Sequence, residues 1–334
     1  CDTEVLLKAY VHYKEKVLDI LDGIYSFAIY HKKEVFIARD RLGVKPLFYT
    51  KKGNNFIFAS EIKAILKSGI IKPIINKKSL LELFALGPSK TPGNAVFKDI
   101  YELKPGHYLK YKKNKIIVRK YWDVKNETFT DTFDDCKNKI RNILENNIKR
   151  QMVSDIPVAT LLSGGLDSSI ITGVCAKELN KNNEILTTYS IDYEDNNKYF
   201  KGNDYQVSED QDYIDLMKND FNTDHKKKVI TQKQLAKYLK EAMIARDLPG
   251  MADIDSSLLW FSKEIKKEHT VILSGECADE IFGGYPWFYK EDLLNKKGFP
   301  WINNLQERSK LLNKKLRKKL NLEKYALKQY KKTI

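Results

Sequence analysis

The chain has 334 residues, enough for about two domains that each bury a core. Its 59 Lys and Arg against 44 Asp and Glu give a formal charge of +15, but most of these cations are lysines spread along the whole chain. Nucleic-acid readers cluster their charge and favour arginine, and the densest basic run, 314–319, is typical of a solvated helix face, so we expect no nucleic-acid partner. The longest uncharged apolar run, 156–166, is far shorter than the ~18 residues of a membrane span, and no secretory signal opens the sequence, so a membrane protein is excluded.

The first part of the chain has the alternating apolar pattern and polar turns of antiparallel strands. The elements that we predict there are a hairpin of strands 23–30 and 34–38, a hairpin of strands 46–49 and 56–59, a short helix over 61–67, and a strand over 108–122. The polar, Thr-rich segment 123–132 is the expected linker.

The second part of the chain alternates strands with helices. The elements predicted there are a helix over 133–152, a strand over 158–162, a helix from residue 168 onward, and strands over 186–191 and 270–273. Two of these strands, 158–162 and 270–273, run directly into glycine turns. This alternation predicts an α/β unit with a parallel sheet that is covered by helices on both faces.

The first glycine turn has the sequence Ser-Gly-Gly-Leu-Asp-Ser-Ser over residues 163–169. Glycines let the backbone approach an anion closely, and the helix N-terminus that follows offers unpaired N–H groups. Asp167 can hold a magnesium ion that bridges phosphates. An ordinary strand-to-helix turn is the alternative, but strand, motif and helix together favour a phosphate site. No Lys follows the second glycine, so this is not a Walker loop; it resembles the pyrophosphate loop of the ATP pyrophosphatases.

The second glycine turn has the sequence Ser-Gly-Glu-Cys-Ala-Asp-Glu over residues 274–280. Ligands of open α/β sheets bind at the carboxyl ends of the strands, so both turns are expected to meet at one crevice. Asp279 would then share a magnesium ion with Asp167, while Glu276 would face the reacting carbonyl. The alternative is that Glu276 and Asp279 only cap the next helix.

Together these turns and the following Ile-Phe-Gly-Gly-Tyr over 281–285 resemble the glutamine-hydrolysing asparagine synthetase family. The first part resembles the class II glutaminase domain of the same family. The motifs that carry this second resemblance are Leu-Asp-Gly at 21–23, Phe-Ala at 27–28, Arg-Asp-Arg-Leu-Gly-Val-Lys-Pro-Leu at 39–47, and Ala-Ser-Glu-Ile-Lys-Ala at 59–64. The resemblance covers nearly the whole chain.

The resemblance implies an α+β and α/β fold. Residues 1–122 would be part of a glutaminase domain, an N-terminal nucleophile hydrolase β-sandwich. Residues 123–132 would be the linker, and residues 133–334 would be part of an adenine-nucleotide-binding domain with a parallel α/β sheet. Because segments of the family's chain before Cys1 and after Ile334 have no counterpart here, we interpret the sequence as an internal fragment.

The resemblance also implies a chemistry. The family uses ATP and Mg²⁺ to convert aspartate to β-aspartyl-AMP, which ammonia from glutamine turns into asparagine. Glu276 is the catalytic residue that the resemblance implies, Asp2 would hold the α-amino group of glutamine, and Asp167 and Asp279 would hold magnesium. The nucleotide-binding residues that it implies are Leu162, Ser163, Gly164, Gly165, Asp167, Ser168, Ser169, Ile191, Ser274 and Gly275. Leu162 and Ile191 have plain strand core as their alternative.

The sequence departs from the family at several positions. Family members begin Cys-Gly-Ile, whereas Cys1 here precedes Asp-Thr-Glu-Val, which corresponds to a segment about 70 residues further into those chains. Cys1 is therefore interpreted as a bystander, and the chain as given is expected not to hydrolyse glutamine. Cys277 stands where glycine is usual, and residues 246–257 replace a Thr- and Ser-containing stretch near the acceptor site.

Four cysteines without paired spacing and five histidines without a zinc pattern predict a reducing, cytoplasmic location and no nitrogen- or sulfur-bound metal. The expected partners are small molecules (aspartate, glutamine and ATP), with a homodimer as the candidate assembly. Two other functions stay open: an amidotransferase that acts on another carboxylate acceptor, such as one that closes a β-lactam or amidates a peptide, and a non-catalytic nucleotide-binding remnant.

Overall fold

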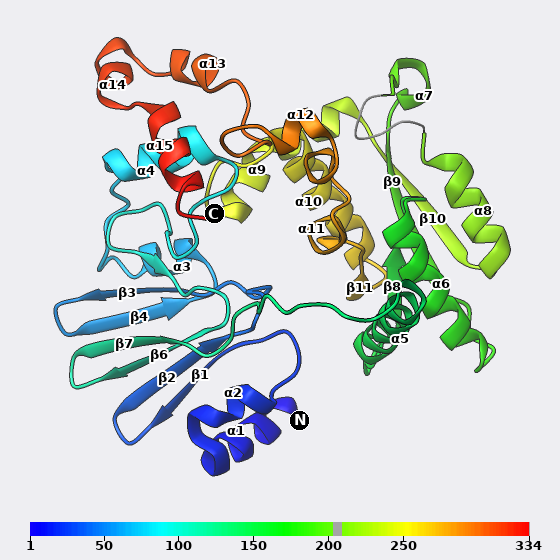
Figure 1. The fold of residues 1–334 in the computed structure, drawn as a ribbon, viewed down its shortest axis with the longest axis horizontal. Helices are drawn as coiled ribbons and strands as arrows, with labels where there is room; N and C mark the ends of the chain where they lie inside the picture. Colours follow the sequence, from blue (N-terminus) through cyan, green and yellow to red (C-terminus); the bar gives the residue numbers. More distant parts are fainter. Residues whose placement is uncertain (203–208, 334) are drawn as a thin grey trace. The chain divides into compact units, whose positions relative to one another are not determined.

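The computed structural model describes residues 1–202 and 209–333. They form two compact units, unit 1 of Cys1–Glu127 with Ile302–Ile334 and unit 2 of Thr128–Trp301, which we describe separately (Figure 1). Within the described ranges, every helix is too short or too polar to cross a bilayer.

The elements of unit 1 are α1 (Asp2–Tyr13), η1 (Lys14–Lys16), α2 (Val17–Ile20), β1 (Ser26–His31), β2 (Glu34–Arg39), β3 (Phe48–Lys52), β4 (Asn55–Ala59), α3 (Ile62–Lys67), α4 (Lys77–Leu81), η2 (Glu82–Leu86), β5 (Tyr101–Glu102), β6 (His107–Lys112), β7 (Lys115–Lys120), α13 (Leu305–Lys310), α14 (Lys314–Lys319) and α15 (Leu322–Tyr330). The elements of unit 2 are α5 (Phe133–Gln151), β8 (Val158–Leu161), α6 (Leu166–Asn180), β9 (Thr187–Tyr193), α7 (Asn196–Tyr199), α8 (Gln211–Phe221), β10 (Asp224–Ile230), α9 (Gln232–Arg246), α10 (Ala252–Lys266), β11 (Val271–Leu273), α11 (Ala278–Phe282), η3 (Pro286–Phe288) and α12 (Glu291–Leu294).

Unit 1 is built on two antiparallel sheets, in the orders β1-β2-β6-β7 and β4-β3-β5. Strand β2 is buried on both faces, as its alternating side chains show. Ile37 packs with Leu109 of β6 against residues of the second sheet, which makes a sandwich. On the other face, Phe36 stacks on Tyr10 of α1 with ring centroids 4.9 Å apart, and α1 and α2 cover that face.

The loop that joins β2 to β3 is held by two buried polar side chains. The guanidinium of Arg39 donates to the carbonyls of residues 43, 45 and 103 and to Glu102 Oε1, at 2.6 to 3.0 Å. The carboxylate of Asp40 accepts from the backbone N–H groups of Val44 and Lys45. Gly43, at φ +72°, provides the left-handed turn between them. Much of the Arg-Asp-Arg-Leu-Gly-Val-Lys-Pro motif is therefore structural in this fold.

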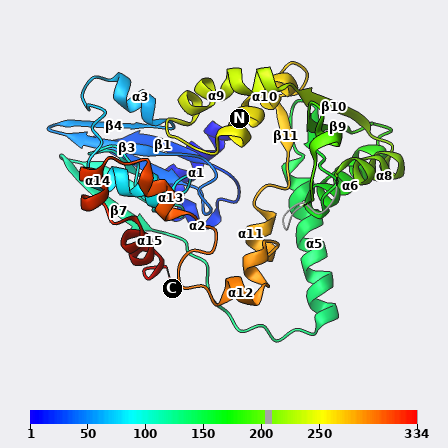
Figure 2. The same cartoon turned by 90° about the horizontal axis from the view of Figure 1, so that it is seen from above.

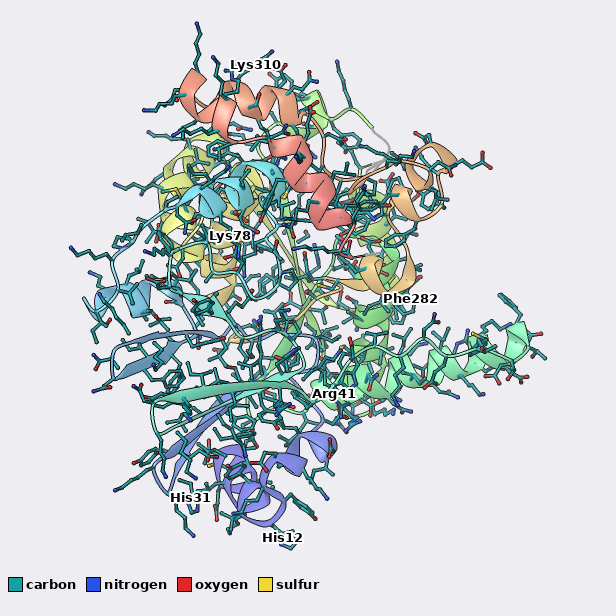
Figure 3. The ribbon with its side chains drawn as sticks, turned by 60° about the vertical axis from the view of Figure 1, so that its left-hand side comes forward. His12, His31, Arg41, Lys78, Phe282 and Lys310 are labelled. Carbon is teal, nitrogen blue, oxygen red and sulfur yellow. The ribbon has the colours of Figure 1, made fainter. Side chains whose placement is uncertain are left out.

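The last part of the chain packs within unit 1. Arg308 Nη1 of α13 donates to the carbonyl of Gly87 at 2.7 Å, and the hydroxyl of Tyr325 of α15 donates to the buried carboxylate of Glu82. Basic side chains of this region are exposed, such as Lys310 of α13, which Figure 3 labels; elsewhere in unit 1, Lys78 of α4 is also exposed. In α14, the basic run 314–319 is likewise exposed at all but Leu316, as predicted for a solvated helix face.

Unit 2 is a parallel sheet in the order β10-β9-β8-β11. Apolar residues of α9 and α10, with Trp260 and Phe261 at the centre, cover one face. Helices α5, α6 and α8 cover the other through a cluster that includes Ile148 and Cys175 (Figures 1 and 2). Strand β8 pairs with β9 on one side and with β11 on its other side. The chain therefore continues from β8 to β9 and β10 in one direction across the sheet, and β11 returns to the opposite side of β8.

The fold class predicted from the sequence is confirmed: an antiparallel sandwich in the first part and a parallel α/β sheet in the second. Two details differ. The strand predicted over 108–122 is a hairpin, because Lys113 and Asn114 take positive φ angles and form a two-residue turn between β6 and β7. Helix α1 was not predicted. The domain limits at 122 and 133 stay predictions, and the packing of residues 302–334 with unit 1 was not anticipated.

We expect Arg39→Met to lower the free energy of unfolding by about 3 kcal/mol, because it removes the donor to three carbonyls and one of the two cations that pair with Glu102, the other being Lys90. Lys8→Met is the control, since its ion pair with Glu4 is exposed and should contribute at most about 0.5 kcal/mol. Urea unfolding followed by circular dichroism measures both. Equal stability of the two variants would contradict the role given to Arg39.

Candidate functional site

The two glycine turns lie side by side at the carboxyl edge of the unit 2 sheet. Strands β8 and β11 are parallel neighbours, with Val158 opposite Val271 and Thr160 opposite Leu273. The turns that follow them therefore leave the sheet at the same edge. This edge is also where the strand order reverses, which is the usual ligand site of an open α/β sheet.

Gly275 shows how closely the turns approach one another. A Cβ at this position would lie 2.8 Å from the Cβ of Asp167 and 3.1 Å from the backbone nitrogen of Ser168. Gly164 has a φ of +76°, and a Cβ there would lie 2.7 Å from the Cβ of Tyr213. Both positions thus require glycine, the first for contact between the two turns and the second for its backbone conformation and its contact with α8.

Hydroxyl groups hold the first turn in shape. Ser168 Oγ donates to the carbonyl of Gly165 at 3.0 Å and accepts from the backbone N–H of Ser163 at 3.2 Å. The hydroxyls of Ser163 and Ser168 lie 3.1 Å apart. Since the proton of Ser168 is used within the turn, this side chain positions the loop in the structure described here.

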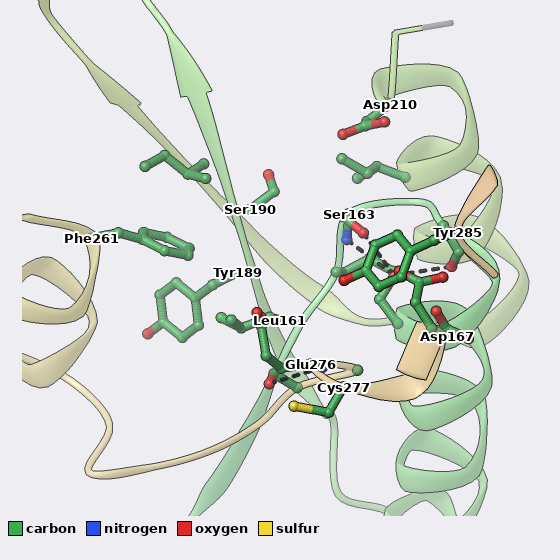
Figure 4. Close-up of a pocket in the computed structure, with 18 residues that line it drawn as sticks. Leu161, Ser163, Asp167, Tyr189, Ser190, Asp210, Phe261, Glu276, Cys277 and Tyr285 are labelled. Carbon is green, nitrogen blue, oxygen red and sulfur yellow. Dashed lines mark hydrogen bonds between the residues drawn. The ribbon is translucent and has the colours of Figure 1, made fainter. Parts of the chain in front are cut away.

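The turns border a cavity of about 330 Å³ (Figure 4). The side chains and backbone that line it come from β8, β9, α6, α8, α10 and the segment after β11. The lining residues are Leu161, Leu162, Ser163, Gly165, Asp167, Ser168, Tyr189, Ser190, Ile191, Asp210, Ile214, Phe261, Ser274, Gly275, Glu276, Cys277, Asp279 and Tyr285. Apolar residues of the strands and α10 thus meet polar residues of the two turns.

The cavity is strongly acidic. Its wall carries four carboxylates, and none of its described lining residues is Lys, Arg or His. Burial, together with the charge of Asp279, raises the pKa of Asp167. Burial and the nearby carboxylates, first among them Glu280, raise the pKa of Tyr285 to about 12, and the Tyr285 hydroxyl donates to Glu280 at 3.1 Å.

The donor set of Asp167 and Asp279 fits a magnesium ion that is shared with phosphates. Their carboxylates are close enough to repel, and among the described residues neither has an ion pair. No group of three or more His, Cys, Asp or Glu in the described ranges could hold a metal ion by itself. Mg²⁺ commonly uses one or two carboxylates together with substrate phosphates and water, which is what this wall offers.

Glu276 is not a helix cap. Helix α11 begins after Cys277, and no side chain caps its first turn. The Glu276 side chain is exposed and has no hydrogen-bond partner among the described residues, so its carboxylate is free to meet a ligand. Cys277 takes a φ of +72°, a left-handed conformation that favours glycine. Burial and the charges of Glu280 and Glu276 raise the pKa of its thiol.

The structure brings together most of the residues predicted for nucleotide and metal binding. Three predicted residues lie elsewhere. Ser169 lines a different groove, between α5, α6 and α8, while Gly164, within the first turn, faces α8 and does not line the cavity. Asp2, in unit 1, lies at the start of α1 and lines an open cavity of about 710 Å³ together with Tyr25, Lys45 and Ser60. Cys1 is exposed beside it.

Sequence reasoning missed several wall residues. Asp210 precedes α8, and Phe261 lies on α10, far along the chain from either turn. Neither belongs to a motif, so no local pattern marks them. Tyr285 follows the second turn closely in sequence, and its place in the Gly-Gly-Tyr motif was the available signal.

Comparison with known proteins gives two family matches. The family described as asparagine synthase matches residues 139–334, and that described as a glutamine amidotransferase domain matches residues 1–122. These matches agree with the resemblance predicted from the motifs.

Individual proteins are also similar to this chain over most of its length. Asparagine synthetase [glutamine-hydrolyzing] 3 of Bacillus subtilis is 51% identical over 100% of this chain and 54% of its own length. A putative asparagine synthetase [glutamine-hydrolyzing] 2 of Methanocaldococcus jannaschii is 33% identical over 88% of this chain and 56% of its own. Amidase chry2 of Gibberella zeae is 27% identical over 90% of this chain and 45% of its own. The chain thus spans about half the length of these relatives.

We expect Asp167→Asn to raise the thermal midpoint of the ligand-free protein at neutral pH. A carboxyl whose pKa is raised by folding destabilises the fold while it is charged, so the cost is present above the raised pKa and is lost as pH falls through it. The difference from wild type should therefore vanish below about pH 4, where the unfolded carboxyl is also protonated. Scanning calorimetry at several pH values measures this.

Asp155→Asn is the matched control, because Asp155 is exposed in the loop before β8 and away from the cavity. A lower midpoint for Asp167→Asn at neutral pH, or a difference that does not change with pH, would contradict the cost that burial and the charge of Asp279 place on the ionised Asp167 carboxylate.

Proposed function

Because this chain belongs to the asparagine synthase family, we propose that it is part of a glutamine-hydrolysing asparagine synthetase, a ligase of asparagine biosynthesis. The observation that carries the proposal is the cavity in unit 2. There a Ser-Gly-Gly turn at a helix N-terminus, a second glycine turn and two close carboxylates meet at the carboxyl edge of a parallel sheet. This arrangement suits the phosphates of ATP and a divalent cation.

In the proposed reaction, a side-chain carboxylate oxygen of aspartate attacks the α-phosphorus of ATP. A P–O bond forms, the bond to the β-phosphate oxygen breaks, and β-aspartyl-AMP and pyrophosphate result. Ammonia then attacks the β-carbonyl carbon, the C–O bond to the phosphate breaks, and asparagine and AMP leave after loss of a proton. Glutamine supplies the ammonia by hydrolysis to glutamate.

The cavity wall suggests roles for its residues. Leu162 and Ile191 would contact the adenosine, and the backbone of Ser274 and Gly275 would contact the nucleotide. The turn that Ser163 and Ser168 stabilise would offer its N–H groups to the phosphates. The same glycine turn includes Gly164 and Gly165, and Ser169 follows in the first helical turn of α6. The backbone N–H of Ser169 donates to the carbonyl of Gly165, so the role of Ser169 in binding would be indirect.

Asp167 and Asp279 would hold the magnesium ion. When bound there, the ion would neutralise charge that develops on the phosphates. The same cation would relieve the repulsion between the two carboxylates, which no cationic side chain of the described wall relieves. Because the cavity wall is acidic, we expect ATP to bind there together with Mg²⁺ rather than as the free anion.

Glu276 is proposed as the catalytic residue. Its carboxylate is exposed at the cavity, unpaired among the described residues, and not used as a helix cap. It would act on the acyl intermediate or on the incoming ammonia. In unit 1, Asp2 would hold the α-amino group of glutamine in the cavity that it lines. A reducing, cytoplasmic location is also proposed, because the four cysteines of the sequence show no paired spacing.

A related amidotransferase is the second candidate. The observation that favours it is the similarity to Amidase chry2, together with the stretch 246–257 that departs from the family near the acceptor site. Pyrophosphate release by the full-length protein separates the candidates: dependence on aspartate supports the synthetase, dependence on another carboxylic acid supports the amidotransferase, and no release supports a non-catalytic remnant.

We expect the double variant Asp167→Asn with Asp279→Asn to weaken magnesium-dependent ATP binding by at least about tenfold, because the cation loses both protein ligands. Titration calorimetry with and without Mg²⁺ measures the affinity. Asp155→Asn with Glu127→Gln, both exposed outside the cavity, is the control pair. An unchanged affinity in the double variant would remove the metal role of these carboxylates.

We expect Glu276→Gln to leave the thermal midpoint and ATP affinity nearly unchanged and to slow asparagine synthesis by the full-length protein at least about tenfold, or roughly 1.4 kcal/mol of barrier. The Glu276 side chain has no hydrogen-bond partner among the described residues, so its replacement should not change stability. If Glu276 acts only on the reaction, the variant should therefore lose synthesis while it keeps its thermal midpoint and its ATP affinity. Loss of the cooperative thermal transition would instead identify Glu276 as structural.

A further inference from the structure

A polar triad of the buried Thr188 and Ser190 with the half-buried His225 lies behind the wall of the cavity, between β9 and β10. The two ring nitrogens of His225 contact different hydroxyls: Nδ1 is 2.8 Å from Thr188 Oγ1, and Nε2 is 2.9 Å from Ser190 Oγ. Thr188 is fully buried and Ser190 is 5% exposed. Ser190 lines the cavity that we assign to the nucleotide, whereas His225 does not. The triad therefore connects a ring outside the cavity to a hydroxyl on its wall.

A neutral imidazole carries one proton, so one of its nitrogens donates and the other accepts. With the proton on Nδ1, Nε2 accepts the proton of Ser190, and the cavity meets only the lone pairs of that oxygen. With the proton on Nε2, His225 donates to Ser190 Oγ, and the hydroxyl proton of Ser190 is free to point into the cavity. The tautomer of His225 thus decides whether the wall offers a donor at this place.

The charged neighbours of His225 are Asp215 and Lys218 on α8 and Asp224 and Lys227 on β10. Burial is the main cause that lowers the pKa of His225, and Lys218 adds to it, so the ring is neutral at neutral pH. Lys227 is itself paired with Asp192 of β9, at 2.7 Å. The choice at neutral pH is therefore between two tautomers rather than between a charged and a neutral ring.

We propose that His225 is a positioning residue of the nucleotide site: its Nε2–H holds Ser190 Oγ and turns the Ser190 hydroxyl toward an acceptor oxygen of the nucleotide. The inference rests on the proposed function, in which a nucleotide occupies this cavity. Because no described wall residue is cationic, each neutral donor on the wall contributes to holding oxygen-rich ligands. The acceptor is an oxygen of the ribose or of a phosphate.

Two substitutions of His225 separate positioning from packing. The amide nitrogen of Gln reaches the position of Nε2 and can donate to Ser190, whereas the amide of Asn reaches only the position of Nδ1 and the Thr188 side. We expect His225→Asn and Ser190→Ala each to weaken binding of AMP by about tenfold, and His225→Gln to stay within about twofold of wild type. Titration calorimetry on the full chain measures this, with thermal unfolding as the check on folding.

Adenosine and AMP identify the acceptor. A loss that is already present with adenosine assigns it to the ribose, and a loss only with AMP assigns it to the phosphate. A long-range ¹H–¹⁵N spectrum of the wild-type protein, in which the His225 signal is identified by its absence in His225→Gln, should move toward the Nε2–H form on saturation with AMP. This measurement needs no substitution at the wall.

Equal weakening by His225→Asn and His225→Gln would overturn the proposal, because a ring that only packs would not distinguish them. So would a His225 spectrum that AMP leaves unchanged, or variants that all bind AMP as wild type does; in both cases the nucleotide site itself would stand. If wild type binds no adenine nucleotide, with or without Mg²⁺, the proposed function fails and this inference fails with it.

Discussion

The parallel pairing of β8 with β11 is the constraint on which the site depends. These strands are separated by more than 100 residues of chain, yet their registered pairing places the two glycine turns at one edge. The contact between Gly275 and the Asp167–Ser168 backbone follows from that pairing and leaves no room for a side chain. A shift of the register would separate Asp167 from Asp279 and open the cavity, so the geometry of the site is determined mainly by the sheet rather than by the turns alone.

The cavity combines features that favour ligand binding but lower the stability of the ligand-free protein. Two carboxylates face one another without a cation in the described wall, and Cys277, a residue with a side chain, occupies a left-handed conformation. Such features cost stability, and proteins tolerate them where binding offsets the cost. The chain is rich in lysine, but in the structure its lysines lie away from this wall. A net charge of +15 thus says little about the electrostatics of the site.

Much of unit 2 could be predicted because its signals are local. A short apolar run followed by Ser-Gly-Gly or Ser-Gly-Glu indicates a buried strand and a turn, and both strands were found as predicted. Several other wall residues could not be predicted in this way. Asp210 and Phe261 reach the cavity only through tertiary packing, and the contacts of His225 depend on the pairing of β9 with β10. In unit 1, the hairpin at Lys113 and Asn114 was missed because its turn carries no glycine.

The order of the units along the chain has a consequence for dissecting the protein. Unit 1 is discontinuous: it contains both Cys1–Glu127 and Ile302–Ile334, so the chain passes from one unit to the other twice. A protease that cuts once near residue 127 would produce two polypeptides. They would still be held together by noncovalent contacts, because Arg308 and Tyr325 of the second polypeptide bind Gly87 and Glu82 of the first. Expression of the first 127 residues alone would leave the Glu82 carboxylate without its phenol partner. The parts of this protein that pack as compact units are therefore not the same as the two consecutive segments that its sequence motifs indicate.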